Sequence, residues 1–432
     1  MKPSDFDNKQ TQILNKIKNS NIRGLENIDI SRLMFNVSGE ALKTTKTESI
    51  KKLIRTVMFD VIKAEYNVTD SNLPLVITYD YHREDHTNYW RKFKAFVAEY
   101  NEIYIEEGRK HYSRVRKPGE ILFVITHYFR AKRQLVNIEN STIRRVLATN
   151  LAELIAFKQK LERHNLNCQS AFIFFDGNRV ENLVVQMLRN CGTTVATMQH
   201  GQPVFHGLDR DRINQTMILN FTSDYIMVTG EFSKKQFMLG GIPEEQIFVG
   251  GSLRNIKGVT DTSEKNFAVF LDCPTNPNAI RDNKELIECA KRISELLGSH
   301  FVIKCHPQDS PQNYVDFSEK RGAFVPKGTS IEKTLEGKEF GILHASGVYL
   351  DIISEGTKAF CYVNDTDFPL VEKGMDSFST TTELLDKIEK WNSYTDTKKQ
   401  EYMNRIIDYY LCPYDVENRY KAFVKKLNAP NS

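Results

Sequence analysis

A histidine between a glutamine and a glycine is the first candidate for chemistry in the chain. An apolar run spans 193–198, and Gln199, His200 and Gly201 follow it directly. An imidazole at this point could act as a general base near neutral pH, and the glycine would let a substrate approach the backbone closely. We predict that His200 is a catalytic base with Gln199 and Gly201 as substrate contacts. A histidine with a purely structural role is the alternative.

A carboxylate competes with this histidine for the role of base. Asp176 follows the apolar run 171–175 and precedes Gly177. Its side chain could accept the proton of an acceptor hydroxyl, although Asp-Gly is also a common turn sequence. The sequence therefore predicts that either His200 or Asp176 is the catalytic base.

Cationic and hydroxyl side chains after two later apolar runs indicate a phosphate site. Lys304 and His306 follow the run 301–303, and Ser346 and Gly347 precede a pattern with helical spacing. A helix that begins at such a pair presents free backbone N–H groups to an anion. We predict that these four residues bind a nucleotide. The structural alternatives are a histidine that caps a loop and a plain helix cap.

Three further residues complete the predicted nucleotide site. Glu355 stands at the end of the helical pattern, where its carboxylate could accept hydrogen bonds from two sugar hydroxyls. Gly230 and Ser252 follow two other apolar runs. Ligands of open parallel α/β sheets bind outside the carboxyl ends of the strands, so we assign all three residues to donor binding.

Neither the acidic residues nor the cysteines favour a metal centre. Asp-x-Asp triplets begin at Asp5, Asp209 and Asp365, and triplets this short arise by chance. The seven cysteines contain no C-x-x-C pair. We expect reduced thiols, no bound metal, and no cofactor apart from a nucleotide-activated substrate.

The elements that must position these residues alternate along the chain. Residues 1–70 have helical periodicity and are predicted to form an N-terminal helical elaboration. Short apolar runs, including 121–126, then alternate with amphipathic stretches, which predicts β-α-β units and parallel sheets. We place a Rossmann-like acceptor domain at 71–220, a Rossmann-like nucleotide-donor domain at 221–395, and C-terminal helices at 396–432. The predicted fold class is α/β.

Size and charge limit the possible partners. The chain of 432 residues is long enough for two or three domains, and its apolar runs have only strand length. An apolar leader is absent from the N-terminus, so we expect a cytoplasmic protein. Ten basic and two acidic residues lie between Arg109 and Arg145. We expect Arg130 and Arg133 to contact an anionic acceptor or the inner face of the cell membrane, and no nucleic acid. A solvated basic face is the alternative.

The order of the motifs resembles the two-domain GT-B glycosyltransferases that build bacterial capsular and other surface polysaccharides. The likeness covers roughly 171–363 and rests on Q-H-G at 199–201, K-x-H-P at 304–307, and the serine and glutamate Ser346 and Glu355. It implies two Rossmann-like domains that face a cleft, with the C-terminal helices packed back on the first. It also implies a nucleotide sugar in the second domain and transfer to a glycan or lipid-linked glycan without a required metal.

Other families have similar motifs. The His-Gly and His-Pro pairs are similar to polyol-phosphate transferases that use CDP-glycerol or CDP-ribitol, although Gln199 stands where those enzymes have tryptophan. Asp176-Gly177 with His306-Pro307 is similar to bacterial sialyltransferases that use CMP-sugars. The UDP-sugar 2-epimerases share the architecture. A glycan-binding or scaffolding protein without turnover is the nonenzymatic alternative.

Overall fold

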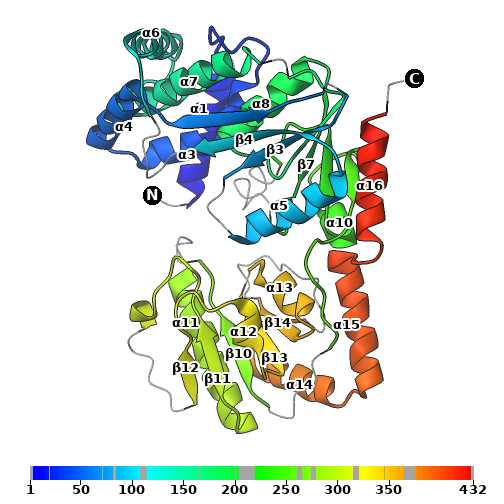
Figure 1. The fold of residues 1–432 in the computed structure, drawn as a ribbon. Helices are drawn as coiled ribbons and strands as arrows, with labels where there is room; N and C mark the ends of the chain where they lie inside the picture. Colours follow the sequence, from blue (N-terminus) through cyan, green and yellow to red (C-terminus); the bar gives the residue numbers. More distant parts are fainter. Residues whose placement is uncertain are drawn as a thin grey trace.

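Two sheets of mainly parallel strands form the centres of two α/β units in the computed structural model of the protein (Figure 1). The structure describes residues 3–18, 20–70, 72–80, 84–107, 114–164, 166–199, 201–203, 219–259, 265–273, 279–314, 321–344, 346–363, 374 and 376–429. No helix within these ranges is both long and apolar enough to cross a membrane.

The chain begins with four helices that belong to the core of the first unit. They are α1 (Pro3–Lys18), α2 (Ile30–Leu33), α3 (Phe35–Lys43) and α4 (Lys46–Met58). A capping box starts α4, because the side chains and backbone N–H groups of Thr45 and Glu48 bond reciprocally. The helices share one buried apolar cluster with α7 (Ser141–Leu161) and α8 (Arg179–Asn190). The prediction of helices throughout 1–70 is wrong at its end, where β1 (Phe59–Asp60) and β2 (Ile62–Asn67) are strands.

The first sheet has the strand order β2-β4-β3-β6-β7-β8-β9. Its other strands are β3 (Leu75–Tyr79), β4 (Asn101–Glu107), β6 (Ser170–Ile173), β7 (Thr194–Met198), β8 (Tyr225–Val228) and β9 (Ile247–Val249). All neighbours pair in parallel except β2, which is antiparallel to β4. Helices cover this sheet on both faces, so its central strands are buried apolar runs. A separate pair joins β1 to β5 (Arg114–Val115).

The sheet topology moves the domain boundary that the sequence predicts near Asn220. β8 pairs with β7 and β9 pairs with β8, so both strands belong to the first unit. The first sheet therefore ends at Val249, and the second sheet begins at Phe267. The apolar pattern of a strand does not reveal which of two sheets it joins, and this explains the displaced boundary.

Helices of the first unit follow the strands on either face. In addition to α7 and α8 they are α5 (Glu84–Val97), α6 (Pro118–Gln134), α10 (Glu231–Leu239) and the short 3₁₀ helix η2 (Glu244–Gln246). The apolar run 121–126, predicted as a strand, lies inside α6. Pro118 stands at the first turn of this helix, and the Glu120 carboxylate accepts a hydrogen bond from the Lys117 N–H at 2.9 Å. These start signals select a helix for the run.

The second sheet is wholly parallel, with the order β12-β11-β10-β13-β14-β15. The strands are β10 (Phe267–Phe270), β11 (Phe301–Lys304), β12 (Gly322–Phe324), β13 (Phe340–Leu343), β14 (Lys358–Tyr362) and β15 (Ser377–Phe378). The helices are α11 (Ala279–Leu297), η3 (Pro311–Tyr314), α12 (Ile331–Leu335), α13 (Val348–Ser354) and α14 (Thr381–Asn392). Counted along the chain, this is the 3-2-1-4-5-6 order of dinucleotide-binding sheets.

Two C-terminal helices connect the units. α15 (Asp396–Leu411) packs on α13 and α10, and α16 (Val416–Leu427) packs on α5. The ring of Phe423 in α16 stacks on Phe248 of the first unit at 4.0 Å between centroids. Figure 1 shows this pair of helices running along one side of both units. Two Rossmann-like units and returning C-terminal helices confirm the predicted α/β, GT-B-like fold class.

Candidate functional site

The carboxyl edge of the second sheet gathers the residues that the sequence assigned to a phosphate. The strand order reverses between β10 and β13, and ligands of such sheets bind outside the strand ends at this point. Lys304 ends β11, next to β10, and His306 follows it. Ser346 and Gly347 follow β13. All four residues therefore stand at one edge of the sheet, after the two strands that flank β10.

A network of hydrogen bonds fixes the loop that carries His306. The Asp309 carboxylate accepts hydrogen bonds from Tyr314 Oη and Asn313 Nδ2, each at 2.6 Å, and the Asp309 N–H donates to the His306 carbonyl. The Gln308 N–H donates to Nδ1 of His306 at 3.2 Å. Because Nδ1 accepts, the neutral imidazole carries its proton on Nε2 and is a hydrogen-bond donor there.

Lys304 is held beside this loop by the chain that follows β12. Its side chain is partly buried, and Nζ donates a hydrogen bond to the Thr329 carbonyl. Burial lowers the pKa of Lys304, because the ammonium loses part of its hydration. An anion brought next to the ammonium would oppose this effect and favour the charged form.

Space for a ligand remains next to the residues after β13. Ser346 Oγ accepts a hydrogen bond from the Val348 N–H at 3.4 Å, and Gly347 is the N-cap of α13. Gly347 is exposed, and a Cβ placed on it would meet no atom within 4 Å. The backbone of Gly347 is therefore open to close approach.

Glu355 lies at the far end of α13 from Ser346. Its carboxylate forms an ion pair with Lys257 at 2.7 Å, and the Lys257 N–H donates to the Ser354 carbonyl. Lys257 belongs to the segment between the two sheets, so Glu355 contacts the link between the units. This contact differs from the donor contact predicted for Glu355, and that donor role stays a prediction.

Gly230 and Ser252 have a structural role in place of the donor contact that the sequence predicts. A Cβ on Gly230 would lie 2.6 Å from the backbone of Tyr410, at the end of α15. The N–H of buried Ser252 donates to the Leu411 carbonyl at 2.7 Å. Both residues therefore hold the first unit against α15. Gly230 must be a glycine because its backbone lies close to the backbone of this helix.

Replacing Gly230 by alanine is expected to lower the free energy of unfolding by about 1–3 kcal/mol, because the added methyl group would force α15 away. Thermal unfolding of the purified variant measures the loss. Gly119→Ala is the matched control, since a Cβ on Gly119 meets nothing within 4 Å. Equal melting temperatures of the two variants would contradict the close packing at Gly230.

Asp176 is enclosed at the edge of the first sheet. It has no exposed surface, and its Oδ2 accepts hydrogen bonds from the Thr222 N–H at 2.8 Å, the Ser223 N–H at 2.9 Å and Ser223 Oγ at 2.8 Å. Burial raises the pKa of Asp176, and these hydrogen bonds oppose the shift. A carboxylate enclosed in this way does not meet an acceptor, which corrects the prediction that Asp176 acts as the base. It anchors the chain that enters β8.

Gln199 fixes the backbone around the predicted reacting centre. Its Oε1 accepts a hydrogen bond from the Thr229 N–H, and its Nε2 donates to the Gly201 carbonyl, both at 2.9 Å. Gly201 has a φ of 73°, a conformation that favours glycine. His200 lies outside the described residues. The side chain of Gln199 is therefore committed to the backbone, and its contact with a substrate stays a prediction.

A buried charged cluster at the same edge was missed by sequence reasoning. Arg179 pairs with Glu107 and with Glu153, the latter at 2.6 Å, and Tyr79 Oη donates to Glu107 at 2.5 Å. Glu181 has no exposed surface, and burial raises its pKa to about 8. The available signal was two charged residues, Arg179 and Glu181, in the first turn of the amphipathic helix α8.

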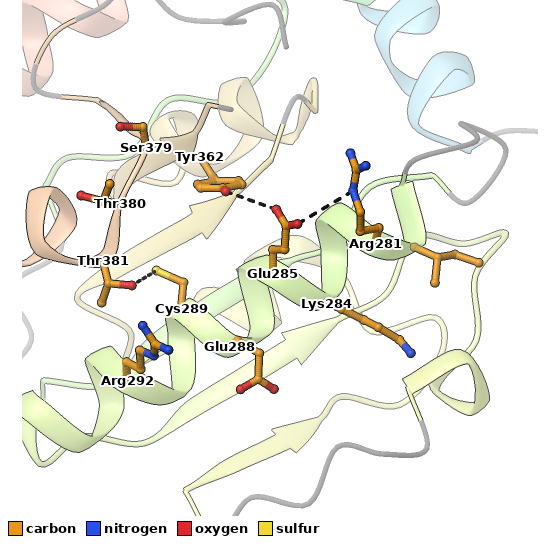
Figure 2. Close-up of a pocket in the computed structure, with 11 residues that line it drawn as sticks. Arg281, Lys284, Glu285, Glu288, Cys289, Arg292, Tyr362, Ser379, Thr380 and Thr381 are labelled. Atoms are coloured by element: carbon orange, nitrogen blue, oxygen red, sulfur yellow. Dashed lines mark hydrogen bonds and ion pairs between the residues drawn. The ribbon is translucent and has the colours of Figure 1, made fainter. Parts of the chain in front are cut away.

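A cavity of about 700 Å³ lies between α11, the end of β14 and the start of α14. Figure 2 shows the hydroxyl of Tyr362 directed at Glu285, with 3.4 Å between the oxygen atoms, and Thr381 against Cys289. The Tyr362 ring also lies 5.7 Å from that of His344. The described lining includes none of the residues that the sequence predicted.

The basic residues predicted to bind an anionic substrate lie elsewhere in the first unit. Arg130 and Arg133 are exposed near the end of α6, and the main contacts of this helix are with α7 and α4. The structure does not bring them to the edge that carries Lys304. Their contact with an anionic acceptor stays a prediction.

A metal site has no support among the residues with defined positions. In that part of the chain, no group of three or more His, Cys, Asp and Glu side chains is arranged to hold an ion.

Comparison with known proteins finds similarity only in structure. No family model and no curated protein matches the sequence. A UDP-GlcNAc 2-epimerase from Neisseria meningitidis matches with a TM-score of 0.48 and 11% identity, over 82% of this chain and 98% of the other. The Methanocaldococcus jannaschii UDP-GlcNAc 2-epimerase matches with a TM-score of 0.47 and 15% identity, over 78% of this chain and 99% of the other. The pneumococcal O-GlcNAc transferase GtfA matches with a TM-score of 0.41 and 14% identity, over 64% of this chain and 60% of the other. Likeness at this level does not define an activity.

Proposed function

We propose that the protein is a glycosyltransferase that moves a sugar from a nucleotide-activated donor to a hydroxyl group of a growing surface glycan. The observation that supports this most is the pairing of a 3-2-1-4-5-6 sheet with Lys304 and His306 at its carboxyl edge. A fixed ammonium group and an imidazole N–H donor, at the same sheet edge as the open glycine Gly347, suit the phosphates of a nucleotide.

In this proposal Lys304 and His306 contact the leaving nucleotide. In the transfer, the bond between the anomeric carbon and the phosphate oxygen breaks, and the nucleotide leaves with its electron pair. Lys304 and the Nε2–H of His306 stabilise the negative charge that develops on this oxygen, without need of a metal ion. The acceptor oxygen bonds to the anomeric carbon and gives its proton to a base, which in this proposal is His200.

A nucleotide is expected to stabilise the protein against thermal unfolding. We would measure shifts with UDP, GDP, CMP and CDP, because a ligand at about 100 times its dissociation constant stabilises by about 2.7 kcal/mol. We expect a rise in melting temperature with only one of the nucleobases, and we expect Lys304→Ala and His306→Ala to abolish it. Lys390→Ala, at an exposed position of α14, is the control and should keep the shift.

The nucleotide that gives the shift also distinguishes between the alternative enzyme classes. CMP would favour a sialyl-type donor and CDP a polyol phosphate. If UDP is selected, the corresponding UDP-sugar is incubated without an acceptor. A 2-epimerase inverts the configuration at C2 of the sugar under these conditions, whereas a transferase leaves C2 unchanged. A folded protein that responds to none of the four nucleotides would contradict the proposal.

A further inference from the structure

Helix α4 exposes a row of apolar side chains. Ile50, Ile54 and Met58 follow one another at intervals of four residues, with exposed fractions of 39%, 57% and 39%. This spacing places them along one side of the helix. The opposite side of α4 packs on α7, so the helix has one face in the protein and one apolar face outside it.

Helix α6 and the strand before it continue this surface. Leu122 and Phe129 lie seven residues apart on α6 and are 66% and 60% exposed, and Val136 follows the helix with 71%. Val115 is 60% exposed and pairs with Phe59, the residue after Met58. α6 also packs on α4 and α7, and Figure 1 shows the two helices together at one end of the first unit, away from the second.

These seven side chains define what we call the α4–α6 face: Ile50, Ile54, Met58, Val115, Leu122, Phe129 and Val136. Isolated apolar residues on a surface are ordinary, but a set gathered on two adjoining helices and on the residues that flank α6 indicates contact with another phase or molecule.

Positive charge surrounds the α4–α6 face. The two segments that carry it, 46–60 and 114–145, contain twelve basic and four acidic residues. The acidic charge is partly neutralised within the protein, since Asp60 pairs with Arg116 at 3.5 Å and also with Lys160. Among the cations, exposed positions include Lys46, Lys51, Lys117, Arg130 and Arg133.

We propose that the α4–α6 face docks on the surface of an anionic lipid bilayer. Its apolar side chains would enter the boundary between head groups and acyl chains, and the surrounding cations would contact lipid phosphates. Charge complementarity selects this occupant. A second copy of the chain would bring the same positive surface against itself in a symmetric contact, and like charges would oppose it.

Flotation with lipid vesicles tests the proposal without reference to the nucleotide site. We expect binding to vesicles of phosphatidylglycerol and phosphatidylcholine, and much weaker binding to phosphatidylcholine alone. Arg130→Glu and Arg133→Glu should each weaken binding at least about fivefold, more at low salt than at high salt. Leu122→Glu and Phe129→Glu should each weaken it at least about tenfold.

Leu296→Glu is the matched control, because Leu296 on α11 is 64% exposed but lies outside the α4–α6 face. It should bind vesicles like the wild type. Absence of binding to phosphatidylglycerol vesicles would overturn the proposal, as would an equal loss in Phe129→Glu and Leu296→Glu. Self-association that Phe129→Glu abolishes, without any binding to vesicles, would assign the face to a second copy. The nucleotide-dependent thermal shift should be unchanged in Leu122→Glu, Phe129→Glu and Leu296→Glu, so failure of the proposed nucleotide site and failure of membrane docking are distinguishable.

Discussion

Replacing Asp376 by asparagine is expected to lower the free energy of unfolding of the second unit by about 3–5 kcal/mol. Asp376 forms an ion pair with Lys358, which is only 2% exposed. The aromatic rings of Trp391 and Tyr402 lie 5.5 and 4.4 Å from the lysine Nζ. Removing the carboxylate would leave the buried lysine without its partner charge. Burial lowers the pKa of Lys358, so this side chain would either carry an unpaired charge or lose its proton, and both cost stability.

The same substitution would weaken the link between two helices. Tyr349 of α13 and Tyr402 of α15 donate hydrogen bonds to the two oxygens of Asp376, each at 2.7 Å. Asp376 therefore joins the helix that follows Ser346 to the helix that crosses between the units. Asparagine keeps one of the two acceptor oxygens, so we expect the loss of stability to include one of these contacts.

Fluorescence of Trp391 during urea unfolding measures this effect locally. The chain has two tryptophans, so a Trp90→Phe background makes Trp391 the sole reporter. The double variant Lys358→Met with Asp376→Asn removes both charges and should recover most of the stability. If the double variant unfolds as readily as Asp376→Asn alone, the buried charge is not the cause of the loss.

Strand positions in the second unit could be predicted from the sequence because its strands are short and apolar. The run at 301–303 and the polar residues after it were located by pattern alone, and the structure places Lys304 and His306 at the expected edge. Parallel strands buried on both faces give this signal whatever the rest of the chain does. The run at 121–126 failed because a short apolar run fits a buried strand and a helix equally well.

Contacts between distant segments could not be predicted. A glycine after a strand allows close approach of either a phosphate or a neighbouring helix. At Gly230 the group that approaches is the backbone of Tyr410, which lies far along the chain. The same holds for Asp176: the sequence pattern predicts an exposed side chain, but it is fully buried and its Oδ2 accepts hydrogen bonds from Thr222 and Ser223. Lys358 is a further case, since nothing local marks a lysine at the start of a strand as buried.

Replacing Glu181 by glutamine is expected to stabilise the protein at alkaline pH and to have little effect at acid pH. Burial raises the pKa of Glu181 from 4.5 to about 8 in the folded chain. A carboxyl group with a raised folded pKa favours folding below its unfolded value, and this contribution is lost as the pH rises toward 8. The full shift corresponds to an effect on the order of 5 kcal/mol, which glutamine abolishes because it does not ionise.

Melting temperatures of Glu181→Gln and the wild type across this pH interval test the prediction. The difference between them should grow in favour of the variant as the pH rises from 4.5 to 8. Glu139→Gln is the control, because the side chain of Glu139 is 93% exposed. A difference for Glu181→Gln that stays constant with pH would mean that the folded protein keeps this carboxylate charged throughout. Arg179, already paired with Glu107 and Glu153, would then have to balance a third negative charge.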